Sequence, residues 1–78
     1  MIGKILKYIR KEKKLTQKEL AKNINIAQTT LSGYETKYSN PTFEVIEKIV
    51  NSCDYEIIFR NKQTKEEITT KNINRKDI

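Results

Sequence analysis

Histidine and tryptophan are absent from this sequence of 78 residues, and cysteine occurs only once. A zinc site needs about four nitrogen or sulfur ligands, and nucleophilic catalysis usually relies on a histidine base. Both kinds of site are therefore out of reach for this composition. We expect no catalytic residues, no bound metal and no cofactor.

The single cysteine, Cys53, cannot form a disulfide within the chain. It has no histidine or lysine neighbour in sequence to activate it, so we expect a small core thiol. Neither a signal segment nor an apolar run long enough to cross a bilayer is visible. These features favour a protein of the reducing cytoplasm with no membrane partner.

A chain of this length forms one domain at most, and its formal net charge is +6. The charge is uneven, because residues 1–14 contain six basic side chains and one acidic side chain. Such asymmetry is compatible with a polyanionic partner.

Four apolar residues of the first segment recur at the spacing of one helical stripe. They are Ile2, Ile5, Leu6 and Ile9. Lysines at positions 4, 7 and 11 turn outward, so the segment predicts a basic amphipathic helix. In isolation, such a helix can lie on an anionic membrane or fill a partner's groove, but the remaining chain argues against both readings.

Thr16 and Glu19 have the spacing of a capping box, which predicts the start of a second helix. This helix should end near Asn23 or Ile24, because Asn25 tolerates the left-handed backbone found after many helices. A third helix follows almost at once. Its inward positions include Leu31 and Tyr34, and small polar groups occupy the opposite face: Thr29, Ser32, Gly33 and Thr36.

Pro41 and Thr42 predict a break followed by a capped fourth helix over about 43–53. Its inward positions are expected to be Phe43, Ile46, Ile49, Val50 and Cys53. Residues 55–59 are typical of a strand. This strand can pair with residues near 66–70 across a turn at 61–65, or with the same strand of a second subunit, and we expect both. Residues 71–78 are predicted to form a flexible basic tail.

Two short helices joined by a tight turn form a helix-turn-helix, whose second helix enters the DNA major groove. The residues at its fixed positions resemble the Cro/repressor-type (XRE-like) helix-turn-helix family of bacteria and phages. They are the run 15–21, Ile24, Ile26, Leu31, Tyr34 and Glu35, closed by 40–42. The resemblance covers about residues 3–54. It implies a mainly α, four- to five-helix lambda-repressor-like domain over 1–54, a strand or hairpin for dimerisation over 55–70, and the tail over 71–78.

The resemblance also assigns roles to individual residues. The base-contacting positions are Gln28, Thr29, Ser32 and Gly33. The phosphate-contacting positions are Thr16, Gln17, Lys37, Tyr38 and Ser39. The structural positions are Ala21, where two helices cross, and Arg10 with Glu35, an ion pair. This sequence departs from the family at Asn25, where glycine is usual, and at Ala27, where serine or threonine often caps the third helix.

We therefore expect sequence-specific binding of double-stranded DNA by a transcriptional regulator, a repressor acting as a homodimer on a palindromic operator. Residues 55–59 are similar to the tail of an antitoxin-type subgroup. The alternative is accordingly an antitoxin that holds a toxin partner and regulates its own synthesis. No aromatic platform for stacking RNA bases is visible.

Overall fold

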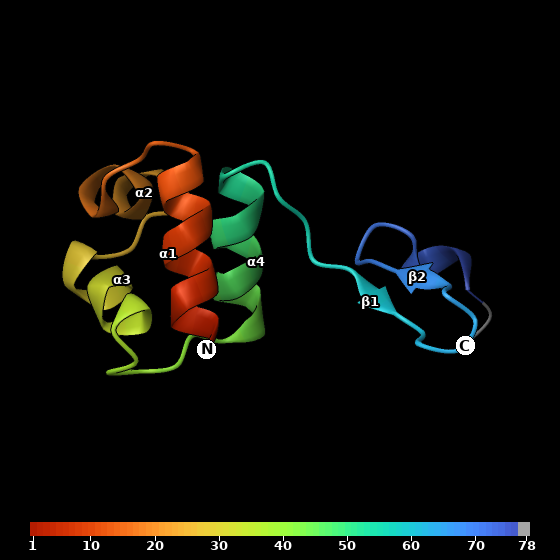
Figure 1. Ribbon diagram of the computed structural model, residues 1–78. Helices are drawn as coiled ribbons and strands as arrows, with labels where there is room; N and C mark the ends of the chain where they lie inside the picture. The colour runs from red at the N-terminus through yellow and green to blue at the C-terminus, as the bar shows by residue number, and fades with distance from the viewer. Residues whose placement is uncertain (77–78) are drawn as a thin grey trace.

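The computed structural model describes residues 1–76, in which four α-helices precede a two-stranded hairpin (Figure 1). The helices are α1 (Ile2–Glu12), α2 (Gln17–Asn23), α3 (Gln28–Glu35) and α4 (Phe43–Ser52). The strands β1 (Phe59–Arg60) and β2 (Glu67–Ile68) are followed by the short 3-10 helix η1 (Ile73–Arg75). The expected helical domain with a terminal hairpin is confirmed.

Short-range signals determine where the helices begin and end. The Thr16 hydroxyl accepts a hydrogen bond from the Glu19 amide at 3.0 Å, and the Glu19 carboxylate accepts one from the Thr16 amide at 2.8 Å. Asn25 follows α2 in the left-handed conformation, with φ of 59°. Ala27 precedes α3 without a side-chain cap, as its methyl group dictates. The predicted boundaries of α2 and the predicted start of α3 after Ala27 are confirmed to within one residue.

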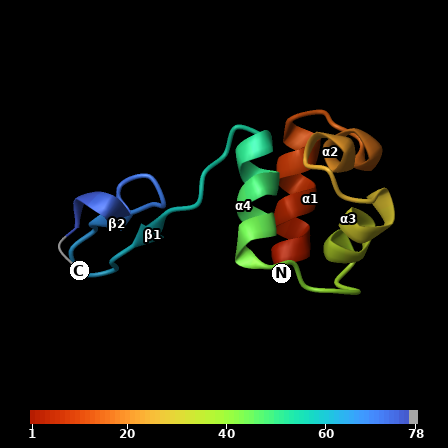
Figure 2. The same cartoon turned by 180° about the vertical axis from the view of Figure 1, so that it is seen from behind.

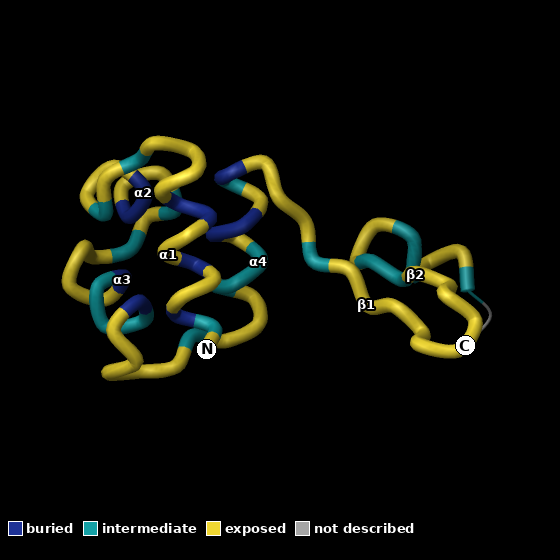
Figure 3. Tube along the Cα trace, viewed as in Figure 1, coloured by how far each residue is buried: buried dark blue, intermediate teal, exposed yellow. Residues whose placement is uncertain are grey.

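Each helix contributes one fully buried side chain to the centre of the helical domain, and burial of a leucine or isoleucine is worth about 1.5–3 kcal/mol. These four residues are Leu6, Leu20, Leu31 and Ile49. Ala21 and Cys53 are buried beside them, each 2% exposed. Figure 3 shows buried residues on all four helices. Burial raises the pKa of the Cys53 thiol, which keeps it protonated and unreactive.

Two side chains that were expected to point inward do not. Ile5 is 47% exposed and Phe43 is 43% exposed. Both line a surface groove that α1 and α4 form with residues 55–59. The ring of Phe43 instead stacks on that of Phe59, with ring centroids 6.0 Å apart.

The strand is shorter than the sequence predicts. Residues 55–58 belong to no strand, the Tyr55 amide donates to the Val50 carbonyl at 2.8 Å, and β1 begins at Phe59. Its antiparallel partner is β2, with Phe59 opposite Ile68 and Arg60 opposite Glu67. The turn sets this register, because the Asn61 carboxamide accepts bonds from the amides of residues 63 and 64, and the Asn61 amide donates to the Glu66 carbonyl.

The hairpin extends from the α4 side of the helical domain, away from α3, in both views (Figures 1 and 2). Residues 71–76 of the predicted flexible tail contain η1. The remainder of that tail, 77–78, lies outside the described residues.

Candidate nucleic-acid interface

The outer face of α3 is polar and carries no charge. Gln28 and Thr29 are exposed at its start, and Ser32 and Gly33 are half-buried towards its end. Leu31 lies on the opposite side of the helix and is fully buried. We call the four outer residues the polar face of α3. The structure thus brings the predicted base-contacting residues onto one side of one helix.

A buried ion pair fixes the end of this helix. Arg10 Nε lies 2.7 Å from Glu35 Oε2, and Arg10 Nη2 donates to Glu35 Oε1 at 3.0 Å. The third nitrogen, Arg10 Nη1, donates to the Leu15 carbonyl at 2.7 Å. Both charged residues are 7% exposed. Arg10 therefore connects α1, the turn before α2 and the last residue of α3.

Gln17 belongs to the same network. Its Nε2 donates to Glu35 Oε1 at 3.0 Å, so the first residue of α2 is joined to the last residue of α3. Burial on its own raises the pKa of Glu35, but the hydrogen bonds from Arg10 and Gln17 outweigh this effect and lower it, helped by the charges of Arg10 and Lys7. The carboxylate stays ionised. The sequence predicted neither the hydrogen bond from Gln17 to Glu35 nor the effect of Lys7 on the pKa of Glu35.

Both predicted phosphate-contacting residues of α2 are already engaged within the protein. The Thr16 hydroxyl closes the capping box, and the Gln17 carboxamide bonds to Glu35. Thr16 is nevertheless exposed and Gln17 is half-buried, so both adjoin solvent at the start of α2.

The loop after α3 folds back onto the polar face. Lys37 adopts the left-handed conformation, with φ of 68°, and the amides of Tyr38 and Ser39 both donate to the Gly33 carbonyl at 2.9 and 3.2 Å. All three loop residues are exposed. The predicted phosphate-contacting loop therefore borders the end of the polar face.

Two other classes of site find no support in residues 1–76. No group of three or more histidine, cysteine, aspartate or glutamate side chains is placed to hold a metal ion there. Among the same residues, no helix combines the length and apolar character needed to cross a bilayer.

Comparison with known proteins identifies the family. Residues 6–59 match the family described as helix-turn-helix, which covers more than half of the chain. The chain belongs to the helix-turn-helix family, and the resemblance inferred from the sequence is confirmed.

Two curated relatives are transcription factors by name. The helix-turn-helix-type transcriptional regulator ImmR of Bacillus subtilis (strain 168) is 40% identical over 58 residues, which cover 69% of this chain and 46% of the relative. The immunity repressor protein of Bacillus phage phi105 is 32% identical over 56 residues, covering 72% of this chain and 39% of the relative. The chain spans less than half the length of either.

One similar solved structure contains nucleic acid. It is the crystal structure of SinR, a master regulator for biofilm formation, in complex with DNA. The two folds superpose with a TM-score of 0.66 at 36% identity, covering 70% of this chain and 89% of the other.

Proposed function

We propose that this protein is a transcriptional repressor that binds double-stranded DNA in a sequence-specific manner, as a homodimer on a palindromic operator. The observation that carries the proposal is the polar face of α3, which is free of charge and anchored from behind by the buried Arg10–Glu35 pair. Small polar side chains suit close approach to base edges, whereas lysine and glutamate serve solubility better. The DNA complex of the similar SinR and the name of the phage repressor support this assignment.

In this proposal the polar face of α3 reads bases. The Gln28 carboxamide can pair bidentately with adenine, and the Thr29 methyl can contact the methyl of thymine. Ser32 offers a hydroxyl, while Gly33 permits close approach of the backbone. Because none of these groups is charged, affinity must come largely from elsewhere.

The residues around the polar face supply the sequence-independent part of DNA binding. The proposed phosphate contacts are Thr16, Gln17, Lys37, Tyr38 and Ser39. Lys18 and Lys22 are exposed on α2 and add positive charge nearby. Contacts of this kind fix register on the duplex but carry little sequence information.

The hairpin side of the molecule supplies the proposed dimer interface. Ile58 is 42% exposed and Phe59 is 55% exposed, and residues 56–58 belong to no strand of the described chain and offer backbone groups for pairing. An isolated two-stranded hairpin is marginally stable in water, so a second copy pairing through 55–59 would complete the sheet. α3 lies on the other side of the molecule, whose longest dimension is 40 Å. Reading of successive major grooves about 34–36 Å apart therefore requires the two copies to overlap along this dimension rather than to meet end to end.

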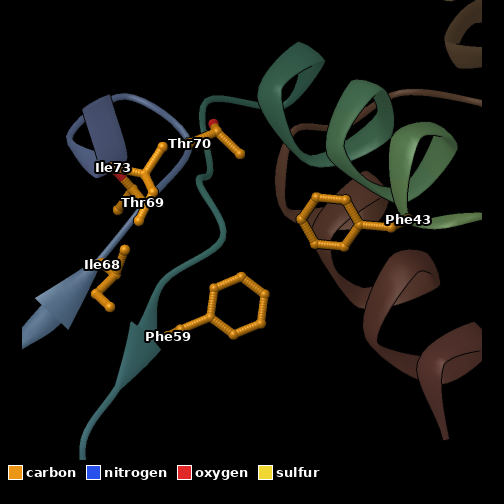
Figure 4. Close-up of a pocket in the computed structure, with 6 residues that line it drawn as sticks. All are labelled: Phe43, Phe59, Ile68, Thr69, Thr70 and Ile73. Atoms are coloured by element: carbon orange, nitrogen blue, oxygen red, sulfur yellow. The ribbon is translucent and has the colours of Figure 1, made fainter. Parts of the chain in front are cut away.

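A shallow apolar groove runs alongside this interface, with a volume of about 410 Å³ (Figure 4). It is lined by Phe43, Phe59, Ile68, Thr69, Thr70 and Ile73. Two contacts join α4 to the segment that contains the hairpin beside this groove. The ring of Phe43 stacks on that of Phe59, and the Thr70 hydroxyl donates to Glu47 at 2.7 Å.

Repression by occupancy requires no catalysis, so the proposal includes neither an enzymatic activity nor a cofactor, and it places the protein in the cytoplasm with the DNA. The toxin-holding alternative remains a prediction. A toxin that co-purifies with the protein from its native host would favour it.

Selection of bound sites from random duplex DNA tests the proposal, with the mass of the complex measured alongside. We expect an enriched inverted repeat occupied by two protein chains. The logarithm of the binding constant should fall linearly with the logarithm of salt concentration. Failure to enrich any sequence, or binding of one chain to a site without symmetry, would contradict the proposal.

A further inference from the structure

Tyr38 is the most exposed of the large apolar side chains, at 91%. It is held in place through its backbone, since its amide donates to the Gly33 carbonyl at 2.9 Å. A Cβ atom built on Gly33 would lie 3.1 Å from Ser39 Oγ, 3.8 Å from Tyr38 Cδ2 and 3.9 Å from Tyr38 Cβ. The ring edge therefore lies in van der Waals contact with the place where a side chain on Gly33 would begin.

This position has a consequence for the polar face of α3. Gly33 has no side chain with which to reach a base, and the Tyr38 side chain borders the space that such a side chain would occupy. A duplex that receives the polar face consequently meets the tyrosine ring at the end nearer Glu35. At that end of the polar face, Tyr38 from the loop therefore offers the side chain that Gly33 of α3 lacks.

We propose that Tyr38 is a specificity-determining residue whose ring contacts the methyl group of a thymine, beyond the phosphate contact assigned to its loop. This inference rests on the proposed function and names one element of sequence that the protein reads. The chemistry follows from the ring, because thymine is the base that presents a methyl group in the major groove and apolar side chains recognise it by contact. The hydroxyl at the far end of the ring is left to bond to the phosphate backbone, so that one side chain serves both purposes.

The two parts of the side chain can be separated by substitution. Tyr38→Phe keeps the ring and removes the hydroxyl, whereas Tyr38→Ala removes both. The exposure of Tyr38 means that neither change disturbs the core. Tyr8, which is 63% exposed on α1, offers a matched control in Tyr8→Ala.

The test uses the selected operator with each thymine replaced in turn by uracil, which differs only in lacking the methyl group. For the wild-type chain, we expect uracil at one symmetry-related pair of positions, in addition to any pair contacted by Thr29, to weaken binding by about fourfold per half-site, the value of one buried carbon. Tyr38→Ala should bind thymine and uracil operators equally at that pair, while Tyr38→Phe and Tyr8→Ala should keep the wild-type discrimination.

Three results would overturn the inference. The first is that uracil has no effect at any position in wild type. The second is that every sensitive pair stays equally sensitive in Tyr38→Ala. The third is that both Tyr38 variants weaken every duplex alike, which would mean a phosphate contact alone. A wild-type protein that binds no duplex at all would remove the proposed function as well, so the two failures are distinguishable.

Discussion

Arg10 and Glu35 lie 25 positions apart in the sequence, yet they form a two-pronged ion pair in which the Glu35 side chain is only 1% exposed. The pair spans α1 and α3, and Gln17 bonds to the same carboxylate from α2. Three helices therefore share one buried charge. The orientation of α3 relative to α1 and α2 depends on that charge being satisfied.

Removal of one member of the pair should be costly. Arg10→Leu leaves the Glu35 carboxylate buried without its main partner, and we expect a loss of about 3–5 kcal/mol in the free energy of unfolding. The double variant Arg10→Leu with Glu35→Leu should recover part of this loss, because it leaves no unpaired buried charge. Urea unfolding of wild type, Arg10→Leu, Glu35→Leu and the double variant measures both effects. A loss below about 1 kcal/mol in the single variant would place the pair with ordinary surface ion pairs.

The same carboxylate predicts how stability depends on pH. The folded-state pKa of Glu35 is lowered relative to its ordinary value of 4.5, so the unfolded chain takes up the proton first as pH falls. The contribution of Glu35 is thus fully present above about pH 4.5 and is lost as pH falls through the folded-state pKa. The Tm of the wild-type protein should fall as pH is lowered through this range. The fall should be smaller in Glu35→Gln.

Glu19 provides a necessary control for that experiment. Its pKa is also lowered, by the hydrogen bond from the Thr16 backbone amide and then by the Thr16 side chain. Glu19→Gln should leave most of the acid dependence in place if Glu35 dominates. An unchanged acid profile in Glu35→Gln would contradict the assignment.

Gly3 marks the closest approach of α1 to α3. A Cβ at this position would lie 2.4 Å from the Tyr34 carbonyl oxygen and 2.9 Å from that of Glu35, both of them backbone atoms. Alanine improves helix propensity by about 1 kcal/mol, but α3 must shift to make room, at a cost typical of overpacking, about 1–3 kcal/mol. We therefore expect Gly3→Ala to lower the Tm.

Gly33→Ala is the matched control for Gly3→Ala. Its nearest neighbour would be the Ser39 hydroxyl at 3.1 Å, a side-chain atom that can rotate away. Because alanine improves helix propensity here too, this variant should keep or raise the Tm of wild type. A higher Tm for Gly3→Ala than for Gly33→Ala would show that the helix contact is looser than the distances indicate.

Ile58 tests the proposed dimer interface without entering the core. Its side chain is 42% exposed and lies in the unpaired stretch before β1. A lysine there places charge in an apolar contact between subunits, so Ile58→Lys should convert dimers to monomers in sedimentation experiments while the Tm of the helical domain changes little. Gln63→Lys, at the exposed turn of the hairpin, adds the same charge and should remain dimeric. Dimers that persist in Ile58→Lys would place the interface elsewhere.

Local chemistry made much of the fold predictable. The capping box at Thr16 and the left-handed residue at Asn25 each depend on neighbours within a few positions, so their signals survive in the sequence alone. Helical periodicity likewise identified Leu6 and Leu31 as core residues. These local features are sufficient to predict the helices and the turn between α2 and α3.

Features that depend on distant partners were predicted less well. Periodicity placed Ile5 and Phe43 on apolar stripes, but it does not say where the neighbouring helices stop covering a stripe. Strand propensity over 55–59 did not reveal that the chain turns after Ile68, where Thr69 and Asn72 bond to each other, so that pairing stops at Phe59. In both cases the outcome was decided by contacts between segments far apart in the chain.

The candidate site shows the same division. The position of Thr29 on the polar face followed from helical spacing, and that of Gln28 followed from the family resemblance. The bond between Gln17 and Glu35, and the contact of the Tyr38 ring with Gly33, depend on side-chain geometry and on the left-handed backbone at Lys37. Residue spacing in the sequence predicts neither of these contacts.

The central claim is that the polar face of α3 reads DNA bases, and Gln28 tests it most directly. Binding of wild type and Gln28→Ala should be measured by fluorescence anisotropy on the selected operator and on a scrambled duplex at the same salt concentration. We expect the substitution to cost about 1–3 kcal/mol on the operator and almost nothing on the scrambled duplex. Equal losses on both duplexes, or none on either, would contradict the claim.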